Sequence, residues 1–279
     1  MHKFSVPNQK LSIPVKPNLL QKKQLFPTLL KEEISYRNID INLLSEHDRK
    51  KVADEIYEIY TNIFYGWEKD VIYKLLSEEK CILFKVRIFL NGDGKAIGFS
   101  WINARYVHYK GKRYTIFFNA GGLDRTVRKK GLITSFFTSV LVKYILLHPF
   151  EKIYSFQRLI NPASYCAWAK ALHEMYPRHD KDTPKSFTQL TSYLSEVFQY
   201  KSVREENPFV VHSENFVKLD LDGDKPVVSY QKPEANYFHK LTEGRPDHSL
   251  VMLFPCNLKN AVLSVTKNIN KGIRRKLQI

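Results

Sequence analysis

The feature that most constrains the fold is a change of hydrophobic period at Gly131. Upstream of it lie three runs rich in β-branched and aromatic residues, separated by the glycine-containing turns NGDGK and KGKR. These runs, residues 81–90, 96–109 and 114–123, predict an antiparallel meander. Downstream, apolar residues recur at helical spacing as far as Leu147, which predicts one long helix. Any fold of this chain must therefore lead a meander directly into an amphipathic helix.

The elements on either side of this junction extend the pattern. A strand is expected from residue 34, then a helix opened by the capping sequence SEHD, then a second short helix before residue 78. After Leu147, the run EKIYSF predicts a strand, and Asn161 followed by proline predicts the start of another helix. The expected fold is α+β in α/β/α layers, with a mixed, mostly antiparallel central sheet flanked by helices and a C-terminal extension.

Three segments are expected along the chain. Residues 1–31 contain six lysines, four prolines and no acidic residue, which is typical of a flexible basic arm. Residues 32–200 hold the strands and helices described above. Residues 201–279 carry further strand patterns and a basic tail, and they are expected to complete the sheet or to form a small extension.

The charge of the chain favours anionic partners. Its 279 residues carry a formal net charge of +16, which suits a phosphorylated cofactor, nucleic acid or an acidic membrane face. Three cysteines without a Cys-x-x-Cys spacing favour a reducing, cytoplasmic setting. The longest apolar segment, residues 132–147, is too short for a membrane span and contains Lys143.

The helix that begins at Gly131 is an expected anion site. The first N–H groups of a helix have no acceptor within the helix, and the helix dipole adds partial positive charge there. Glycine lets an anion approach the backbone closely. The cations Arg128, Lys129 and Lys130 add side-chain charge at the same place.

The stretch from Leu123 to Ile133, LDRTVRKKGLI, resembles the acyl-CoA-binding motif of the GNAT superfamily of N-acyltransferases. Leu123 takes the place of the strand-end valine, Arg128 that of the arginine or glutamine, and Gly131 that of the second glycine. Lys129 stands where the family often has its first glycine, and Ile133 where it has a small residue. The resemblance extends over about residues 32–176 and includes the order of the expected elements.

The resemblance implies a fold, a co-substrate and a set of binding residues. The co-substrate is acetyl-CoA or another acyl-CoA, the acceptor is an amine, and no metal takes part. A bulge at Gly121–Gly122 would open the sheet for the pantetheine arm, and a backbone N–H of Gly122 or Leu123 would polarise the thioester carbonyl. The implied cofactor-binding residues are Leu123, Arg128, Lys129, Lys130, Gly131, Leu132, Ile133, Thr134 and Asn161.

The acid and the base are less specified by the resemblance. The family's tyrosine, seven residues after the pantetheine-binding asparagine, is replaced here by Trp168. Tyr165 is the candidate acid, although it could equally be a core or surface aromatic residue. Asp124 is the candidate base, His108 is a second one, and each has a structural interpretation as well. A chain of water molecules is the alternative to a protein base.

A different class of function is compatible with the same sequence. A catalytically silent GNAT-like scaffold could use its positive charge, its basic arm and the KGIRRK tail to hold nucleic acid or another anionic partner. The histidines show no metal-ligand spacing on a common element, and Asp220-Leu-Asp-Gly-Asp is interpreted as a hairpin turn. The motifs do not specify the acceptor amine.

Overall fold

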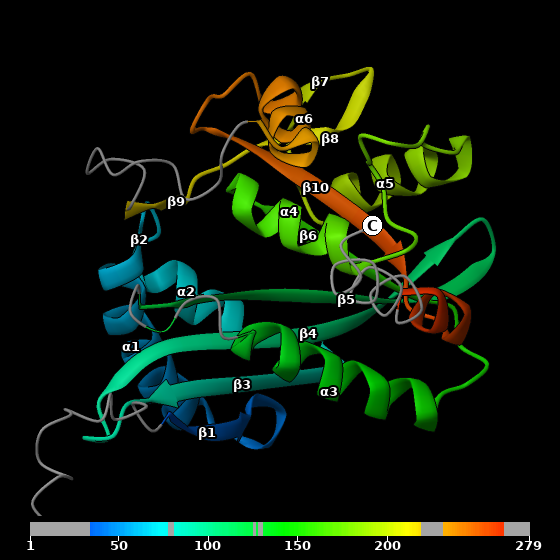
Figure 1. Cartoon of the computed structure of the whole chain (residues 1–279). Coiled ribbons are helices and arrows are strands. Elements are labelled where there is room, and N and C mark those ends of the chain that lie inside the picture. The colour runs from blue at the N-terminus through cyan, green and yellow to red at the C-terminus, as the bar shows by residue number, and fades with distance from the viewer. Residues whose placement is uncertain (1–33, 78–80, 125–126, 128–130, 219–230, 265–279) are drawn as a thin grey trace, which may run out of the picture. The chain divides into compact units, whose positions relative to one another are not determined.

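An eight-stranded mixed sheet organises the part of the chain that the computed structural model describes, residues 34–77, 81–124, 127, 131–218 and 231–264. Its strand order is β1-β3-β4-β5-β6-β10-β8-β7 (Figure 1). The strands are β1 Ser35–Asp40, β3 Leu83–Leu90, β4 Ala96–Tyr109, β5 Lys112–Leu123, β6 Ile153–Leu159, β7 Ser202–Arg204, β8 Asn207–His212 and β10 His248–Pro255. Only β5 and β6 pair in parallel. The predicted mixed, mostly antiparallel sheet is confirmed.

Helices cover both faces of this sheet, which confirms the predicted α/β/α layering. The helices are α1 Glu46–Ile63, α2 Lys69–Leu76, α3 Leu132–Leu147, α4 Pro162–Ala171, α5 Lys185–Val197 and α6 Pro233–Thr242. One face is packed by α1 and α2 at one end and by α5 at the other. The opposite face is packed by α3, α4 and α6 in one continuous cluster. Each face of the sheet is therefore buried by its own set of helices.

The meander forms as the sequence predicts. β3, β4 and β5 pair antiparallel, and the turn between β4 and β5 consists of Lys110 and Gly111, with φ of 49° and 71°. Positive φ at both central residues gives the turn a twist that matches the flanking strands. The helix starts are also as expected: the Ser45 side chain accepts from Asp48 N at 3.2 Å, and Asn161 accepts from Ser164 N at 2.8 Å.

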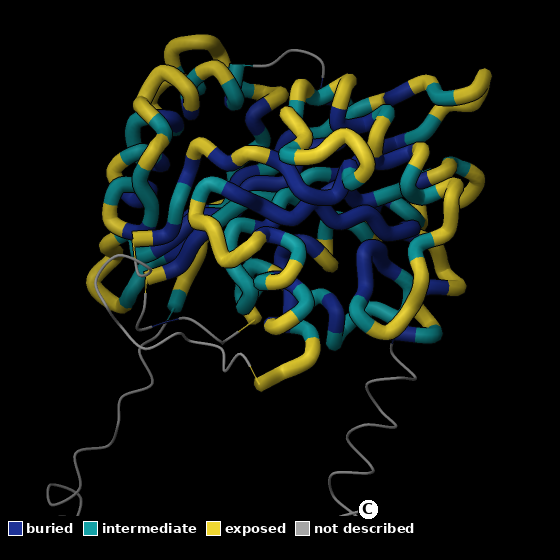
Figure 2. Tube along the Cα trace, turned by 90° about the horizontal axis from the view of Figure 1, so that it is seen from above, coloured by how far each residue is buried: buried dark blue, intermediate teal, exposed yellow. Residues whose placement is uncertain are grey.

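The C-terminal strands are part of the main sheet. β10 lies between β6 and β8, and all of its residues are buried, as the dark central strands of Figure 2 illustrate. A second, small sheet pairs β2, Phe64–Tyr65, with β9, Phe216–Val217. The segment after residue 200 thus completes the sheet and also contacts the end of α1. The turn at Asp220 lies outside the described residues.

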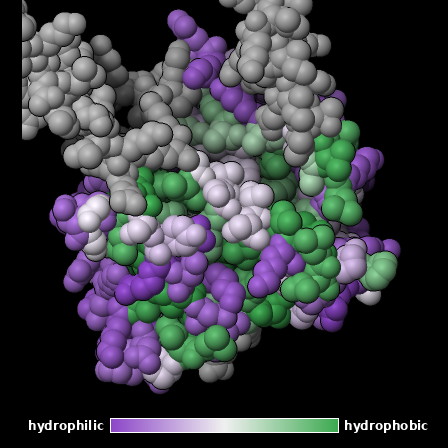
Figure 3. Space-filling view, turned by 60° about the horizontal axis from the view of Figure 1, so that its bottom comes forward, coloured by the Kyte–Doolittle hydropathy of each residue, from purple (hydrophilic) through white to green (hydrophobic). Residues whose placement is uncertain are grey.

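Apolar side chains also occur on the outer side of α3. Val142, Leu146 and Leu147 of α3 are exposed, as is Phe150 in the turn that follows the helix, and hydrophobic areas lie on the face of the molecule in Figure 3. Within the described ranges, no helix is both long enough and apolar enough to cross a bilayer.

Candidate active site

β5 and β6 separate halfway along their length. Their parallel pairing covers Thr115–Phe117 against Ile153–Ser155 and then stops, although β5 continues to Leu123 and β6 to Leu159. Beyond this point β5 pairs only with β4, and β6 pairs only with β10. In Figure 1, β10 runs obliquely to β4 and β5. The sheet therefore opens at Phe117 and Ser155, and beyond this point no strand of the described ranges pairs with the β6-facing edge of β5.

A buried glutamine holds the point of separation. The Oε1 atom of Gln157 accepts from the backbone N–H of Asn119 at 3.0 Å, in place of the carbonyl that a neighbouring strand would supply. Its Nε2 donates to Ser155 Oγ at 2.5 Å, and Ser100 Oγ donates to Asn119 Oδ1 at 3.1 Å. Gln157 is 2% exposed, so this network is shielded from water. It satisfies the first backbone group that the separation leaves without a partner.

We expect Gln157→Leu to lower the free energy of unfolding by ~1–3 kcal/mol, because it leaves the buried N–H of Asn119 without an acceptor. Urea unfolding measures the change. The same substitution at the exposed Gln189 is the control, expected to shift stability by less than ~0.5 kcal/mol. Equal stability of the two variants would contradict the role assigned to Gln157.

The backbone of Gly121 points into the separation. Along a strand, the N–H and C=O of alternate residues point to the same side. Thr115 N donates to Lys152 O and Asn119 N to Gln157 Oε1, so the N–H of Gly121 also points toward β6. Asp124 N donates to Ile97 O, so Gly122, two residues earlier, points toward β4. Of the backbone donors at the strand end, Gly121 and Leu123 thus point toward β6, and the expected donor Gly122 points away from the opening.

The expected bulge at Gly121–Gly122 is wrong. The pairing of β4 with β5 runs in unbroken register from Tyr109 to Gly98, and the sheet opens on the other side of β5. Both glycines are needed for packing. A Cβ at Gly121 would lie 2.5 Å from Phe99 O, and one at Gly122 would lie 2.5 Å from the ring of Phe64.

The start of α3 has the geometry of an anion site. Gly131 is its N-cap, with φ 69° and with open space where a Cβ would lie. No side chain caps the helix, and its first turn contains no acidic residue. The first N–H groups of Leu132, Ile133 and Thr134 have no acceptor within the helix. Here the structure places these sequence-predicted residues beside the end of β5, since Leu132 and Ile133 pack against Leu123 and Val127.

The remaining predicted cofactor residues divide into two groups. Arg128, Lys129 and Lys130 lie outside the described residues. Asn161 stands two residues after the end of β6, and its Oδ1 accepts from Ser164 N at the start of α4. The helix cap thus occupies this oxygen, and the amide group on the same side chain is the part that could donate to a pantetheine carbonyl.

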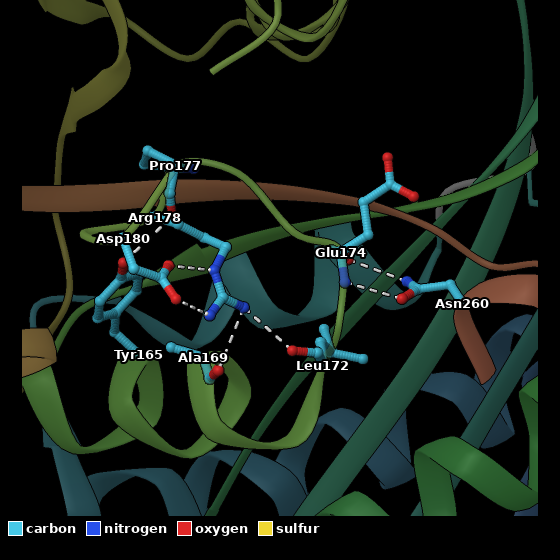
Figure 4. Close-up of polar contacts among 8 residues, drawn as sticks. All are labelled: Tyr165, Ala169, Leu172, Glu174, Pro177, Arg178, Asp180 and Asn260. Atoms are coloured by element: carbon cyan, nitrogen blue, oxygen red, sulfur yellow. Dashed lines mark hydrogen bonds and ion pairs between the residues drawn. The ribbon is translucent and has the colours of Figure 1, made fainter. Parts of the chain in front are cut away.

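Tyr165 is a core residue rather than an accessible acid. It is fully buried, and its hydroxyl donates to Pro177 O at 3.1 Å (Figure 4). Burial raises the pKa of Tyr165 far above its ordinary value. Trp168, which stands where the family has its tyrosine, packs against Phe137 and Phe254. We therefore do not propose Tyr165 as the acid.

Arg178 secures the end of α4 beside Tyr165. Its guanidinium donates to both carboxylate oxygens of Asp180, at 2.6 and 2.8 Å, and to the carbonyls of Ala169 and Leu172 (Figure 4). The hydrogen bond from Arg178 lowers the pKa of Asp180 to about 2. No sequence pattern indicated this cluster, because the buried arginine lies in an irregular segment.

The two candidate bases lie at opposite ends of the strands. Asp124 directly follows Leu123 at the open end of β5 and is exposed. His108 pairs with Arg113 near the β4–β5 turn, at the closed end. Eight residues of strand between Arg113 and Gly121 correspond to ~26 Å, so His108 is too far from the opening to act there. The interpretation of His108 as a base is wrong for this site.

Aromatic side chains line the face of the sheet covered by α1 and α2, near the opening between β5 and β6. Trp67 stacks on Tyr60 and on Trp101, with ring centroids 5.7 and 6.3 Å apart and planes within 8° of parallel. Burial raises the pKa of Tyr60, and the hydrogen bond from the Trp67 backbone, followed by the positive charge of Arg158, opposes the rise. The Tyr60 hydroxyl donates to Tyr65 O and accepts from Trp67 N, which fixes the connection between α1 and α2.

One group in the described part of the chain has metal-ligand chemistry. His212, Asp247 and His248 have ligand atoms within 4.8 Å of one another. Arg245 already donates to both carboxylate oxygens of Asp247, and His248 Nδ1 is hydrogen-bonded to Thr242 O. A cation would have to share that carboxylate with a guanidinium, so we assign no metal to the group.

Known proteins resemble this chain in structure but not detectably in sequence. No protein-family model matches the sequence, and no curated protein matches it. The chain is similar to Arabidopsis thaliana NAA60 in complex with acetyl-CoA, at 12% identity over 80% of this chain and 98% of that chain, with a TM-score of 0.34. It is also similar to the GNAT family N-acetyltransferase YhbS of Escherichia coli in complex with CoA, at 18% identity over 49% and 68% of the two chains, with a TM-score of 0.33. An aminoglycoside acetyltransferase from an uncultured soil metagenomic sample matches at 16% identity over 44% and 76%, with a TM-score of 0.29.

At these TM-scores the fold assignment rests on the topology of this chain. The meander, the glycine-capped α3 and the strand β6 follow in the order that the sequence predicts, and β6 pairs parallel with β5 before separating from it. This order is consistent with the GNAT-like fold that the sequence predicts. In this arrangement, α3 lies on one face of the opening and the Trp67 cluster on the other.

Proposed function

We propose that the protein is an acyl-CoA-dependent N-acyltransferase that transfers an acetyl or other acyl group to an amine. The observation that carries the proposal is the opening between β5 and β6, with the Gly121 N–H pointing into it and the uncapped start of α3 beside the strand end. A pantetheine arm could bond the edge of β5 that faces the opening, as a neighbouring strand would, while the pyrophosphate meets the helix N-terminus. The proposed cofactor residues are Gly131, Leu132, Ile133 and Thr134, with Arg128, Lys129 and Lys130 as sequence-based additions.

The chemistry follows from this arrangement. The amine nitrogen attacks the thioester carbon, a C–N bond forms, and the C–S bond breaks to release the CoA thiolate. A backbone N–H such as that of Gly121 stabilises the negative charge that develops on the carbonyl oxygen. Holding both reactants in line supplies much of the rate. Asp124 remains the proposed base, because it stands exposed at the open end of β5.

Calorimetric titration with acetyl-CoA tests the proposal directly, followed by detection of free thiol in the presence of a panel of amines. We expect binding and amine-dependent thiol release. If the protein does not bind acetyl-CoA at millimolar concentration, the proposal is wrong. The alternative, an inactive scaffold that holds nucleic acid, rests on net charge, and it predicts nucleic-acid affinity that falls steeply with added salt.

A further inference from the structure

Arg158 is a partly buried cation without a carboxylate partner among the described residues. Its Nη2 donates to the neutral Asn215 Oδ1 at 2.9 Å. Its guanidinium carbon lies 5.6 Å from the ring centroid of Trp67 and 5.4 Å from that of Tyr200. Aromatic rings attract a cation but do not neutralise it. Removing a guanidinium from water is costly unless an anion compensates for it.

The chain holds this guanidinium in place from two sides. Asn215 is 8% exposed, and the Ser213 hydroxyl donates to Asn215 O at 2.9 Å. The same segment pairs with the end of α1 through β2 and β9. Gly66, with φ 110°, permits the approach, because a Cβ there would lie 2.0 Å from Glu214 O. The residues around Arg158 are therefore fixed before any ligand arrives.

Arg158 stands at the opening of the sheet. Ser155 is the last residue of β6 that pairs with β5, opposite Phe117, so Arg158 is level with Ala120 and one residue short of Gly121. Its contact with Trp67 places its side chain on the face of α1 and α2, opposite α3. If the acyl-CoA enters beside α3, Arg158 lies on the side from which the acceptor approaches.

A buried amide oxygen on this face accepts no hydrogen bond from the described residues. Asn103 is 6% exposed, and its Oδ1 accepts no hydrogen bond in the described structure. It lies two residues along β4 from Trp101, on the same face of the sheet, and Trp101 stacks on Trp67. A buried amide oxygen without a donor is costly, and an N–H group of a ligand would satisfy it.

We propose that Arg158 binds a carboxylate of the acceptor, so that the acceptor is an amino-carboxylic acid with an apolar or aromatic side chain. This inference rests on the proposed acyltransferase function and names its substrate class. The guanidinium takes the carboxylate, Asn103 Oδ1 accepts from an acceptor N–H, and the rings of Trp67 and Tyr200 contact the side chain. A polycationic acceptor is disfavoured, because Arg158 and the net charge of +16 repel it.

The test compares the common amino acids as free acids with the same amino acids as carboxamides, using acetyl-CoA as donor. Each pair shares its amine and side chain and differs in one negative charge. For at least one apolar or aromatic member, we expect kcat/KM for the free acid to exceed that of the amide by ~10–100-fold, as for a charged hydrogen bond. Arg158→Met should bring this ratio close to one through a rise in KM, and Arg158→Lys should restore part of it.

Arg113→Met is the matched control. Arg113 also stacks on a tyrosine, 4.4 Å from the Tyr106 centroid, but it lies at the closed end of the sheet. Arg113→Met removes the same charge as Arg158→Met, and we expect its ratio of kcat/KM for the free acid to that for the amide to stay at the wild-type value. Tryptophan fluorescence titration with the free acids provides a readout without acyl transfer, because Trp67 lies beside the guanidinium.

The outcomes separate the two proposals. The inference is overturned, and the acyltransferase function is retained, if the protein binds acetyl-CoA and transfers the acyl group but shows no preference for free acids. The same holds if Arg158→Met keeps the preference. Failure to bind acetyl-CoA would overturn the function. In that case, the fluorescence titration decides about the carboxylate site. Binding of free acids that is lost in Arg158→Met supports the site, and lack of binding to the wild type rejects it.

Discussion

Gly131→Glu is expected to weaken acetyl-CoA binding by ~100-fold or more, which corresponds to at least ~2.8 kcal/mol. The substitution places a carboxylate at the start of α3, where the proposed pyrophosphate meets the free N–H groups of the first turn. It also fills the open space beside the backbone. Calorimetry with acetyl-CoA measures the loss.

Gly111→Glu is a closely matched control. Gly111 has φ 71° where Gly131 has φ 69°, and neither has an atom within 4 Å of the position that a Cβ would take. Both variants should therefore lose ~1–2 kcal/mol of stability through the left-handed backbone. Only the Gly131 variant should lose affinity, because Gly111 lies in the β4–β5 turn. Unchanged affinity in Gly131→Glu would move the cofactor site away from α3.

Arg178→Met is expected to lower the free energy of unfolding by about 3 kcal/mol, because two backbone carbonyls and Asp180 lose a charged hydrogen-bond donor. The arginine side chain is 4% exposed, and its loss also removes the donors to Ala169 O and Leu172 O at the end of α4. The melting temperature should fall by roughly 6–12 °C for a chain of this size. Differential scanning calorimetry and urea unfolding measure the two quantities.

Arg245→Met tests whether burial causes this effect. Arg245 and Asp247 form the same two hydrogen bonds at the same sequence spacing, at 3.0 and 2.8 Å, but the arginine side chain is 57% exposed. Exposed pairs contribute at most ~1 kcal/mol, so this variant should be close to the wild type. Similar losses in the two variants would show that Arg178 has no special role.

Acid titration gives a second measurement of the Arg178 pair. The pKa of Asp180 is about 2 in the folded protein against an ordinary value of 3.8, because Arg178 hydrogen-bonds its charged form. The stabilisation is therefore complete above about pH 4 and is lost as the pH falls toward 2. In Arg178→Met this part of the acid dependence should disappear, while the acid dependence from other carboxylates persists.

Local sequence signals predicted the elements well and the site only in part. The turn at Lys110–Gly111, the Ser45 cap and the glycine start of α3 all depend on neighbouring residues, and the structure has each of them. The separation of β5 from β6 was expected, but its cause was assigned to a bulge at Gly121–Gly122. The structure has no bulge there, and the opening is accommodated instead by Gln157, a residue on another strand, whose side chain replaces a backbone carbonyl.

Sequence by itself thus determined the order of strands and helices as far as α5, the turn residues and the glycine start of α3, because hydrophobic period and glycine conformation are local properties. It did not indicate α6. Tertiary structure alone decided which side chains meet at the opening. The cluster at the opening combines Arg158 from β6, Trp67 from the α1–α2 connection and Asn215 from the segment before β9. Their contacts depend on long-range pairing. It also showed that Tyr165 is buried in the core, since a helix pattern shows which residues share a face but not which neighbour covers that face.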